Sequence, residues 1–175
     1  MLESSEFLDL VTQETRGYAK NLLQNLHAAL TQGAYTVACA ESVTGGMLSE
    51  ALTRLPKSSN FFMGGIICYH PRIKVEAVGL DAALLRQFGV VSAPVAEALA
   101  IGIAKRMRTR VGVSTTGQAG PDTISGLPVG TVFVGLSVDG KTQTRRLDLQ
   151  GDRQQIRQAA VLQALRLLDE ALRTG

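Results

Sequence analysis

The fold is decided by the stretch Thr36-Val37-Ala38-Cys39-Ala40-Glu41-Ser42-Val43-Thr44-Gly45-Gly46. Its apolar first part, 36–40, is typical of a short buried strand, and a helical pattern follows the two glycines. The turn between them lies at the carboxyl end of a strand, where open α/β sheets place ligands. Backbone amides at the helix start favour phosphate or carboxylate. The turn therefore predicts an anion site beside a serine nucleophile, Ser42, although an ordinary Ser/Thr helix cap explains the same residues.

Helical and strand patterns alternate outward from this stretch. We expect helices over 8–30, 46–55, 93–108 and 152–172, and short helical turns over 73–78 and 81–88. We expect strands over 36–40, 61–69 and 110–115, then a hairpin of 129–138 and 142–149 around Asp139-Gly140. Gly17 would divide the first helix, and Ser92 would cap the helix that carries Pro94 in its first turn. The order predicts an α/β fold, a three-layer α/β/α sandwich with a mixed central sheet.

Composition narrows the class of protein. The 175 residues are 45% hydrophobic and 19% charged, which is typical of a globular domain. We expect a single domain over 1–175, with a helical segment at 1–30 and an α/β core at 34–172. The net charge is only +3, and no basic stripe carries aromatic residues, which argues against nucleic-acid binding. Cys39 and Cys68 both lie in apolar runs. We therefore expect them to be buried free thiols in a protein of a reducing compartment.

No apolar run approaches the roughly 20 residues that span a bilayer. The first residues are acidic and lack the apolar region of a signal peptide. We therefore expect a cytoplasmic protein with no membrane partner.

Two further loops carry reactive or anion-binding groups. The loop after residues 61–69 contains Tyr69, His70 and Lys74, and a lysine or tyrosine near a serine acts as a general base when its pKa is depressed. Taken singly, Lys74 suits a solvated helix position, and His70 suits the surface or a position where its ring is hydrogen-bonded. The loop 116–121 holds two glycines and a proline, and its amides suit an anion or oxyanion, or merely connect a strand to the hairpin.

The sequence does not contain other common catalytic or binding motifs. The sequence contains no phosphate-loop motif, no dinucleotide fingerprint and no Gly-x-Ser-x-Gly elbow. Its two histidines, His27 and His70, do not form a metal-ligand pattern. We expect no metal and no cofactor.

Six blocks of sequence occur together in a recognisable order. They are Ala-Glu-Ser-Val-Thr-Gly-Gly (40–46), Tyr69 with Lys74, Val91-Ser92, Thr-Gly-Gln-Ala-Gly-Pro (116–121), Pro-Val-Gly-Thr-Val (128–132) and Gly-Asp-Arg-x-x-Ile-Arg (151–157). Over about residues 20–172, they resemble the C-terminal domain of the competence/damage-inducible protein CinA. Stand-alone versions of that domain are nicotinamide-nucleotide amidases.

This resemblance implies an activity and a set of site residues. The activity is hydrolysis of the carboxamide of nicotinamide mononucleotide to nicotinate mononucleotide and ammonia, with no metal or organic cofactor. Ser42 matches the nucleophile, and Tyr69 and Lys74 match its base partners, so that Lys74 takes the serine proton directly or through Tyr69. Amides around Thr44–Gly46 would stabilise the oxyanion. The residues expected to bind substrate are Glu41, Thr44, Gly45, Gly46, Thr116, Gly117, Ala119, Gly120, Arg153 and Arg157, with one of the two arginines on the phosphate.

The sequence departs from the family pattern in two loops. The family's Tyr-Ser-Asn-x-x-Lys is here Tyr69-His70-Pro71-Arg72-Ile73-Lys74, and its double glycine after Ala-Gly-Pro is replaced by residues 122–126. These changes favour an alternative from another class, a paralogue that binds a nucleotide as a regulatory module without turnover. Retention of Ser42, Tyr69, Lys74 and Thr116 together favours the enzyme, because a pure binder needs no serine–lysine pair. We also expect a homodimer or higher homo-oligomer, formed through the strand at 61–69 or the hairpin.

Overall fold

A computed structural model of the chain describes residues 13–123 and 126–174. Within these ranges, five strands form a mixed sheet in the order β2-β1-β3-β4-β5. The strands are β1 (Val37–Glu41), β2 (Phe62–Ile67), β3 (Val111–Gly117), β4 (Thr131–Val138) and β5 (Lys141–Asp148). β1 pairs in parallel with both β2 and β3, whereas β4 is antiparallel to β3 and to β5. The carboxyl ends of β1, β2 and β3 therefore meet at one edge of the sheet.

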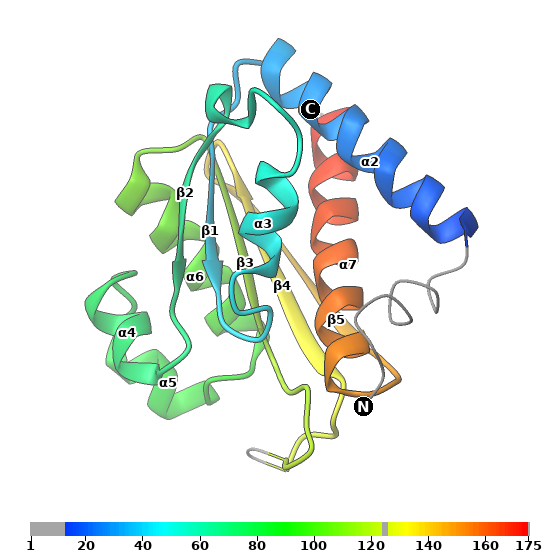
Figure 1. Ribbon diagram of the computed structural model, residues 1–175. Coiled ribbons are helices and arrows are strands. Elements are labelled where there is room, and N and C mark those ends of the chain that lie inside the picture. Colours follow the sequence, from blue (N-terminus) through cyan, green and yellow to red (C-terminus); the bar gives the residue numbers. More distant parts are fainter. Residues whose placement is uncertain (1–12, 124–125, 175) are drawn as a thin grey trace.

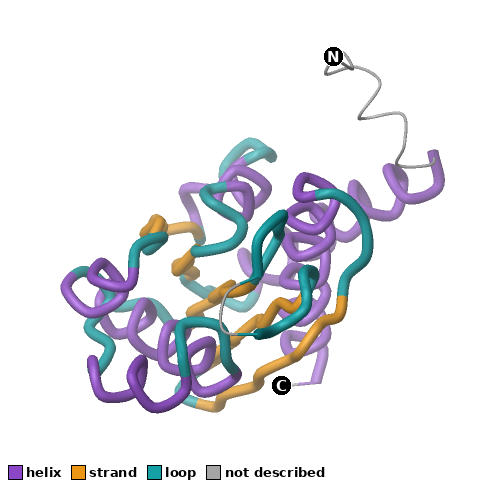
Figure 2. Tube along the Cα trace, turned by 90° about the horizontal axis from the view of Figure 1, so that it is seen from below, coloured by secondary structure: helices purple, strands orange, loops and turns teal. Residues whose placement is uncertain are grey.

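Helices cover both faces of the sheet (Figures 1 and 2). On one face lie α3 (Met47–Thr53) and α7 (Arg153–Thr174), with α2 (Gln13–Gln32) packed on α7. On the other face, α6 (Ala93–Met107) crosses all five strands. α4 (Pro71–Glu76) and α5 (Ala82–Phe88) lie beside α6, and a short 3-10 turn, η1 (Ser58–Asn60), precedes β2. The expected α/β/α sandwich is confirmed.

Each face of the sheet has its own apolar core. Leu99 and Ile103 of α6 pack with Ala38 of β1 on one face, and Leu48 of α3 packs with Val113 of β3 on the other. Gly112 is required in β3 because a Cβ at this position would collide with the backbone of α6. This close approach holds α6 directly on the centre of the sheet.

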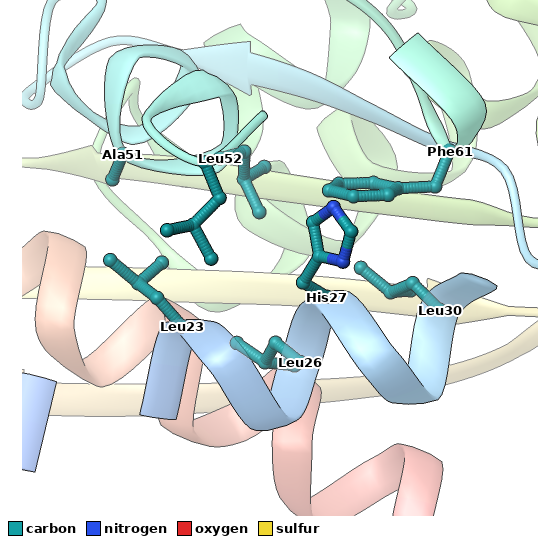
Figure 3. A pocket seen from close by; sticks show the side chains of 8 residues that line it. Leu23, Leu26, His27, Leu30, Ala51, Leu52 and Phe61 are labelled. Carbon is teal, nitrogen blue, oxygen red and sulfur yellow. The ribbon is translucent and has the colours of Figure 1, made fainter. Parts of the chain in front are cut away.

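The contact of α2 with α3 is filled by apolar side chains and one histidine (Figure 3). The His27 ring meets Phe61 edge-to-face, with the ring centroids 5.2 Å apart, and its Nε2 lies 3.0 Å from the Pro56 carbonyl oxygen. Leu23, Leu26, Leu30, Ala51 and Leu52 surround them. The remaining space is about 10 Å³, which is room for one water molecule. This contact is core packing rather than a ligand site.

Most expected elements are present, and the differences have local causes. α2 continues through Gly17, so the expected division is wrong. The start of this helix expected from residue 8 lies outside the described residues. Ser92 is the first cap residue of α6, but its hydroxyl donates to the Gly89 carbonyl at 3.2 Å instead of accepting a helix amide. β2 ends at Ile67 because the chain then turns into α4.

The hairpin turn follows expectation. Asp139 and Gly140 both have positive φ, 49° and 83°, as the favoured two-residue turn requires. Among the described helices, none is long and apolar enough to cross a membrane.

Candidate functional site

A cavity of about 450 Å³ lies at the edge where β1, β2 and β3 end, at the lower end of the sheet in Figure 1. Loops far apart in the sequence enclose it, together with the start of α7. Its lining consists of Ser42, Val43, Tyr69, Pro71, Lys74, Val90, Val91, Thr116, Gly117, Gln118, Ala119, Gly120, Asp122 and Arg153. The fold therefore brings the three expected loops to one place.

Ser42 and Lys74 are in direct contact in this cavity. The Lys74 Nζ donates to the Ser42 Oγ at 2.8 Å and to the Cys68 carbonyl oxygen at 2.5 Å. Lys74 is only 1% exposed, whereas Ser42 is half-buried and faces the cavity. Burial lowers the pKa of Lys74 because it disfavours the ammonium form, and the nearby Cys68 thiol opposes this shift only in part. The amine is suited to accept a proton from the serine.

His70 and Pro71 start the helix that carries Lys74. The His70 Nδ1 accepts a hydrogen bond from the Arg72 amide at 3.2 Å, and the Ile73 amide donates to the His70 carbonyl at 2.9 Å. Pro71 stands in the first turn, where a helix has no use for its missing N–H. The His70-Pro71 departure from the family motif thus still provides a helix start, and α4 presents Lys74 to Ser42.

The helix start next to Ser42 is already occupied by a carboxylate of the protein. Glu41 is completely buried, and its Oε2 accepts from the amides of Gly46 (2.9 Å) and Leu48 (3.0 Å). Its Oε1 accepts from the amide (2.8 Å) and the hydroxyl (2.6 Å) of Ser49. Thr44 adds a hydrogen bond of 2.7 Å to the Oε2 of Glu41. The expectation of a ligand anion at this helix start is therefore wrong, because Glu41 fills the position.

Arg157 also holds the turn instead of facing the cavity. Its Nε donates to the Val43 carbonyl at 3.2 Å, and its Nη2 donates to the Thr44 carbonyl at 2.9 Å. Gly45 and Gly46 have φ of 57° and 99°, a region that favours glycine. Five residues that were expected to contact the substrate instead shape the Ser42 turn and do not line the cavity. They are Glu41, Thr44, Gly45, Gly46 and Arg157.

Arg153 and Tyr69 meet at the mouth of the cavity. The guanidinium of Arg153 donates to the Gly120 carbonyl at 2.6 Å and to the Tyr69 hydroxyl at 3.0 Å. Tyr69 is 59% exposed. Because its hydroxyl bonds Arg153 while Lys74 bonds Ser42 directly, the relay from Lys74 through Tyr69 is not formed. Tyr69 and Lys74, which the family resemblance paired as base partners, thus occupy different parts of the cavity.

The glycine-rich loop after β3 forms the opposite wall. The Thr116 hydroxyl donates to the Val90 carbonyl at 2.6 Å, and Gly117, Ala119 and Gly120 line the cavity. Gly117 leaves no room for a side chain, since a Cβ there would lie 2.7 Å from Val132 Cγ2.

Sequence reasoning missed several lining residues. Gln118 lies within the recognised loop, is 3% exposed and donates to the Leu127 carbonyl at 3.1 Å. Its position in the motif was a usable signal. Val91 belongs to the recognised Val91-Ser92 block but was given no role in the site, and no local pattern marked Val90. Asp122 adds a carboxylate to the rim. In the described ranges, no cluster of three or more His, Cys, Asp or Glu residues is placed to hold a metal ion.

Comparisons with known proteins agree on the family. The family model of the CinA C-terminal domain matches residues 19–172 of this chain. A CinA-like protein from Frankia casuarinae is 43% identical over 143 residues, which are 82% of this chain and 33% of that protein. A CinA-like protein from Mycobacterium sp. (strain JLS) is 44% identical over 157 residues, 89% of this chain and 37% of that protein. The chain spans about a third of the length of these curated relatives.

Solved structures of similar size share the fold. A competence-damaged protein (CinA) superfamily protein from Klebsiella pneumoniae has a TM-score of 0.87 at 26% identity, over 90% of this chain and 99% of that one. The competence/damage inducible protein CihA from Agrobacterium tumefaciens has a TM-score of 0.84 at 31% identity, over 89% and 95%. By sequence and by structure, this chain belongs to the CinA C-terminal domain family.

Proposed function

We propose that this protein hydrolyses the carboxamide of nicotinamide mononucleotide, with Ser42 as the nucleophile and Lys74 as its general base. The observation that carries the proposal is the 2.8 Å contact of the Lys74 Nζ with the Ser42 Oγ inside the cavity. A lysine buried to this extent and bonded to a half-buried serine suits nucleophile activation. A binding module has no need of such a pair.

The reaction follows from this contact. Neutral Lys74 takes the proton of the Ser42 hydroxyl as the Oγ forms a bond to the carboxamide carbon. The lysine ammonium then returns a proton to the carboxamide nitrogen, the C–N bond breaks, and ammonia leaves an ester on Ser42. Water, deprotonated by Lys74, attacks this ester and releases nicotinate mononucleotide with the serine restored. The Cys68 carbonyl keeps the Nζ in place through both steps.

The oxyanion requires donors from the Ser42 turn or the glycine-rich loop. The amide of Gly46 is bound to Glu41, and that of Ser42 donates to the Thr115 carbonyl at 2.9 Å. Thr44 is completely buried and neither Thr44 nor Gly45 lines the cavity, so the oxyanion requires other backbone amides that do line it.

The remainder of the cavity is compatible with a nucleotide. Its volume of about 450 Å³ falls in the usual range for small-molecule sites. Pro71, Val90 and Val91 offer apolar walls for a pyridine ring, and Arg153 at the mouth offers a guanidinium for a phosphate.

A nucleotide-binding module without turnover is the second candidate. The Asp122 carboxylate at the rim favours it, because this residue replaces a glycine of the family and changes the charge of the cavity. The His70-Pro71 change supports it less than the sequence suggested, since the two residues still start the helix that carries Lys74.

Ammonia release from nicotinamide mononucleotide by the purified full chain tests the proposal. The Ser42→Ala variant is measured in parallel, with Ser59→Ala, an exposed serine outside the cavity, as the matched control. We expect turnover in the wild type and in Ser59→Ala and none in Ser42→Ala. Full turnover in Ser42→Ala would overturn the serine mechanism. Absence of turnover in the wild type, with a rise in melting temperature on adding the nucleotide, would establish the binding module instead.

A further inference from the structure

The guanidinium of Arg153 joins two loops across the mouth of the cavity. Arg153 is the first residue of α7, and its Nη1 donates to the Gly120 carbonyl oxygen, in the loop after β3, at 2.6 Å. Its Nη2 donates to the Tyr69 hydroxyl, in the loop after β2, at 3.0 Å. These partners lie 33 and 84 residues from Arg153 in the sequence. The two contacts therefore exist only when α7 and the two strands are assembled.

The two contacts hold a flexible side chain in one place. Arg153 is exposed, and a free arginine side chain samples many rotamers that it must give up when it binds a ligand. Tyrosine has only two side-chain torsions, so its hydroxyl is a comparatively rigid acceptor. Tyr69 and Gly120 thus fix the guanidinium before any ligand arrives.

The guanidinium keeps its charge and some of its donors available. An arginine has five N–H donors in a planar fork. In the part of the chain that the structure describes, Arg153 uses two of them, and both acceptors, a carbonyl and a phenol, are uncharged. Asp122 lines the same cavity, but within the described residues no ion pair joins it to Arg153. The remaining N–H groups suit the oxygens of a phosphate.

Tyr69 is placed to hold Arg153 and not to transfer protons. Its hydroxyl accepts from Arg153, and its side chain is 59% exposed. Lys74, in contrast, is 1% exposed and donates directly to Ser42 at 2.8 Å. The proton path therefore runs between Ser42 and Lys74, and the hydroxyl of Tyr69 leads to α7.

We propose that Tyr69 is a positioning residue that fixes the Arg153 guanidinium at the mouth of the cavity and thereby makes the site select a phosphate monoester. This inference rests on the proposed function, in which Arg153 binds the phosphate of nicotinamide mononucleotide. Tyr69 strengthens ligand binding through Arg153, because a guanidinium that is already in place loses less freedom on binding. It contributes nothing to the chemical step at Ser42.

A double-mutant cycle on Tyr69 and Arg153 tests this role. Tyr69→Phe keeps the ring and removes the hydroxyl, and we expect KM for nicotinamide mononucleotide to rise about two- to tenfold. The kcat should stay within about twofold of the wild type. In the Arg153→Met background the same change should leave KM as it is, because no guanidinium remains for Tyr69 to hold.

Tyr35→Phe is the matched control for Tyr69→Phe. The Tyr35 ring also contacts an arginine, with the Arg110 guanidinium carbon 4.1 Å from the ring centroid, but neither residue lines the cavity. Both KM and kcat of this variant should match the wild type.

Three results of the cycle would overturn the inference. A lower kcat with an unchanged KM in Tyr69→Phe would return Tyr69 to the chemical step. An equal rise in KM with and without the Arg153 guanidinium would mean that Tyr69 acts on the ligand itself. Unchanged KM and kcat in Tyr69→Phe would mean that the contact contributes nothing to binding.

A second readout separates this inference from the proposed substrate. Calorimetry with ribose 5-phosphate measures the phosphate site without a carboxamide, and ribose is the control ligand. We expect Tyr69→Phe to raise the dissociation constant of ribose 5-phosphate about two- to tenfold relative to the wild type and to Tyr35→Phe. If this difference is found while no ammonia is released from nicotinamide mononucleotide, the proposed reaction is wrong and the role of Tyr69 stands. Equal dissociation constants would overturn the role of Tyr69, and a wild type that does not bind ribose 5-phosphate would overturn the phosphate site with it.

Discussion

The Nζ of Lys74 lies 2.8 Å from the Oγ of Ser42, although 32 residues separate them in the sequence. Ser42 follows β1, and Lys74 belongs to the helix that follows the neighbouring parallel strand β2. Parallel pairing places both segments at the same end of the sheet, and burial then favours the neutral amine. The contact gives the cavity a nucleophile and a base in one hydrogen bond.

Replacing Lys74 by methionine should abolish turnover without unfolding the protein. The general base supplies about a hundred- to ten-thousandfold in rate, and we expect a loss in that range. The free energy of unfolding should stay the same or rise, because the variant no longer buries a polar amine away from water. Ammonia release and thermal melting measure the two effects. Lys105→Met, an exposed lysine of α6, is the control, and its kcat should match the wild type.

The lowered pKa of Lys74 predicts how activity depends on pH. Only the neutral amine accepts the serine proton, so kcat should rise with pH through the pKa of Lys74. Because burial lowers this pKa, the rise should be complete below the ordinary lysine value of about 10.4. A pH–rate profile checks this, and a kcat that is independent of pH below that value would contradict it.

The same shift predicts how stability depends on pH. Between the lowered pKa of folded Lys74 and the ordinary value of the unfolded chain, the unfolded state binds one more proton than the native state. The free energy of unfolding should therefore rise with pH across that window for the wild type relative to Lys74→Met. The contribution of Lys74 is lost as the pH falls through the folded pKa. Urea denaturation of both proteins over a pH series gives the difference, which would stay constant if the lysine titrated normally.

Removing the helix cap at His70 should destabilise the protein, although the variant leaves every residue that lines the cavity in place. His70→Ala loses the acceptor for the Arg72 amide, and loss of a cap costs about 1 kcal/mol in the free energy of unfolding. His70→Asn supplies another cap and should restore stability. We expect a small fall in kcat for His70→Ala only, because Lys74 lies on the same helix. Identical denaturation midpoints for the alanine variant and the wild type would show that the cap carries no stability.

Arg153 should act on the phosphate and not on the chemical step. Arg153→Met removes the guanidinium at the mouth of the cavity, and we expect KM for nicotinamide mononucleotide to rise about tenfold, the equivalent of one charge-assisted hydrogen bond. The kcat should stay within about twofold of the wild type. The dephosphorylated nucleoside serves as the matched substrate, and its KM should not respond to the variant. Equal effects on both substrates would place Arg153 elsewhere than on the phosphate. Arg86→Met, on the exposed last turn of α5, is the control variant.

The sequence by itself determined the elements whose causes are local. The apolar run of β1, the glycines after Ser42 and the periodic apolar positions of α6 and α7 predict strand, turn and helix because each depends on neighbours a few residues away. The Asp139-Gly140 hairpin follows for the same reason. The family motifs also marked the loops that enclose the cavity, including the positions of Ser42, Lys74 and Thr116.

The tertiary structure decided which way each marked side chain turns. Arg153 and Arg157 stand one turn apart on α7, yet one reaches the mouth of the cavity and the other holds the Ser42 turn from behind. Glu41 belongs to the same motif as Ser42 but turns inward to fill the start of α3. Local patterns fix the backbone of a strand or helix. Contacts between segments as far as 114 residues apart depend instead on how α4, α6 and α7 pack against the sheet, and only that packing separates the residues that line the cavity from those that support it.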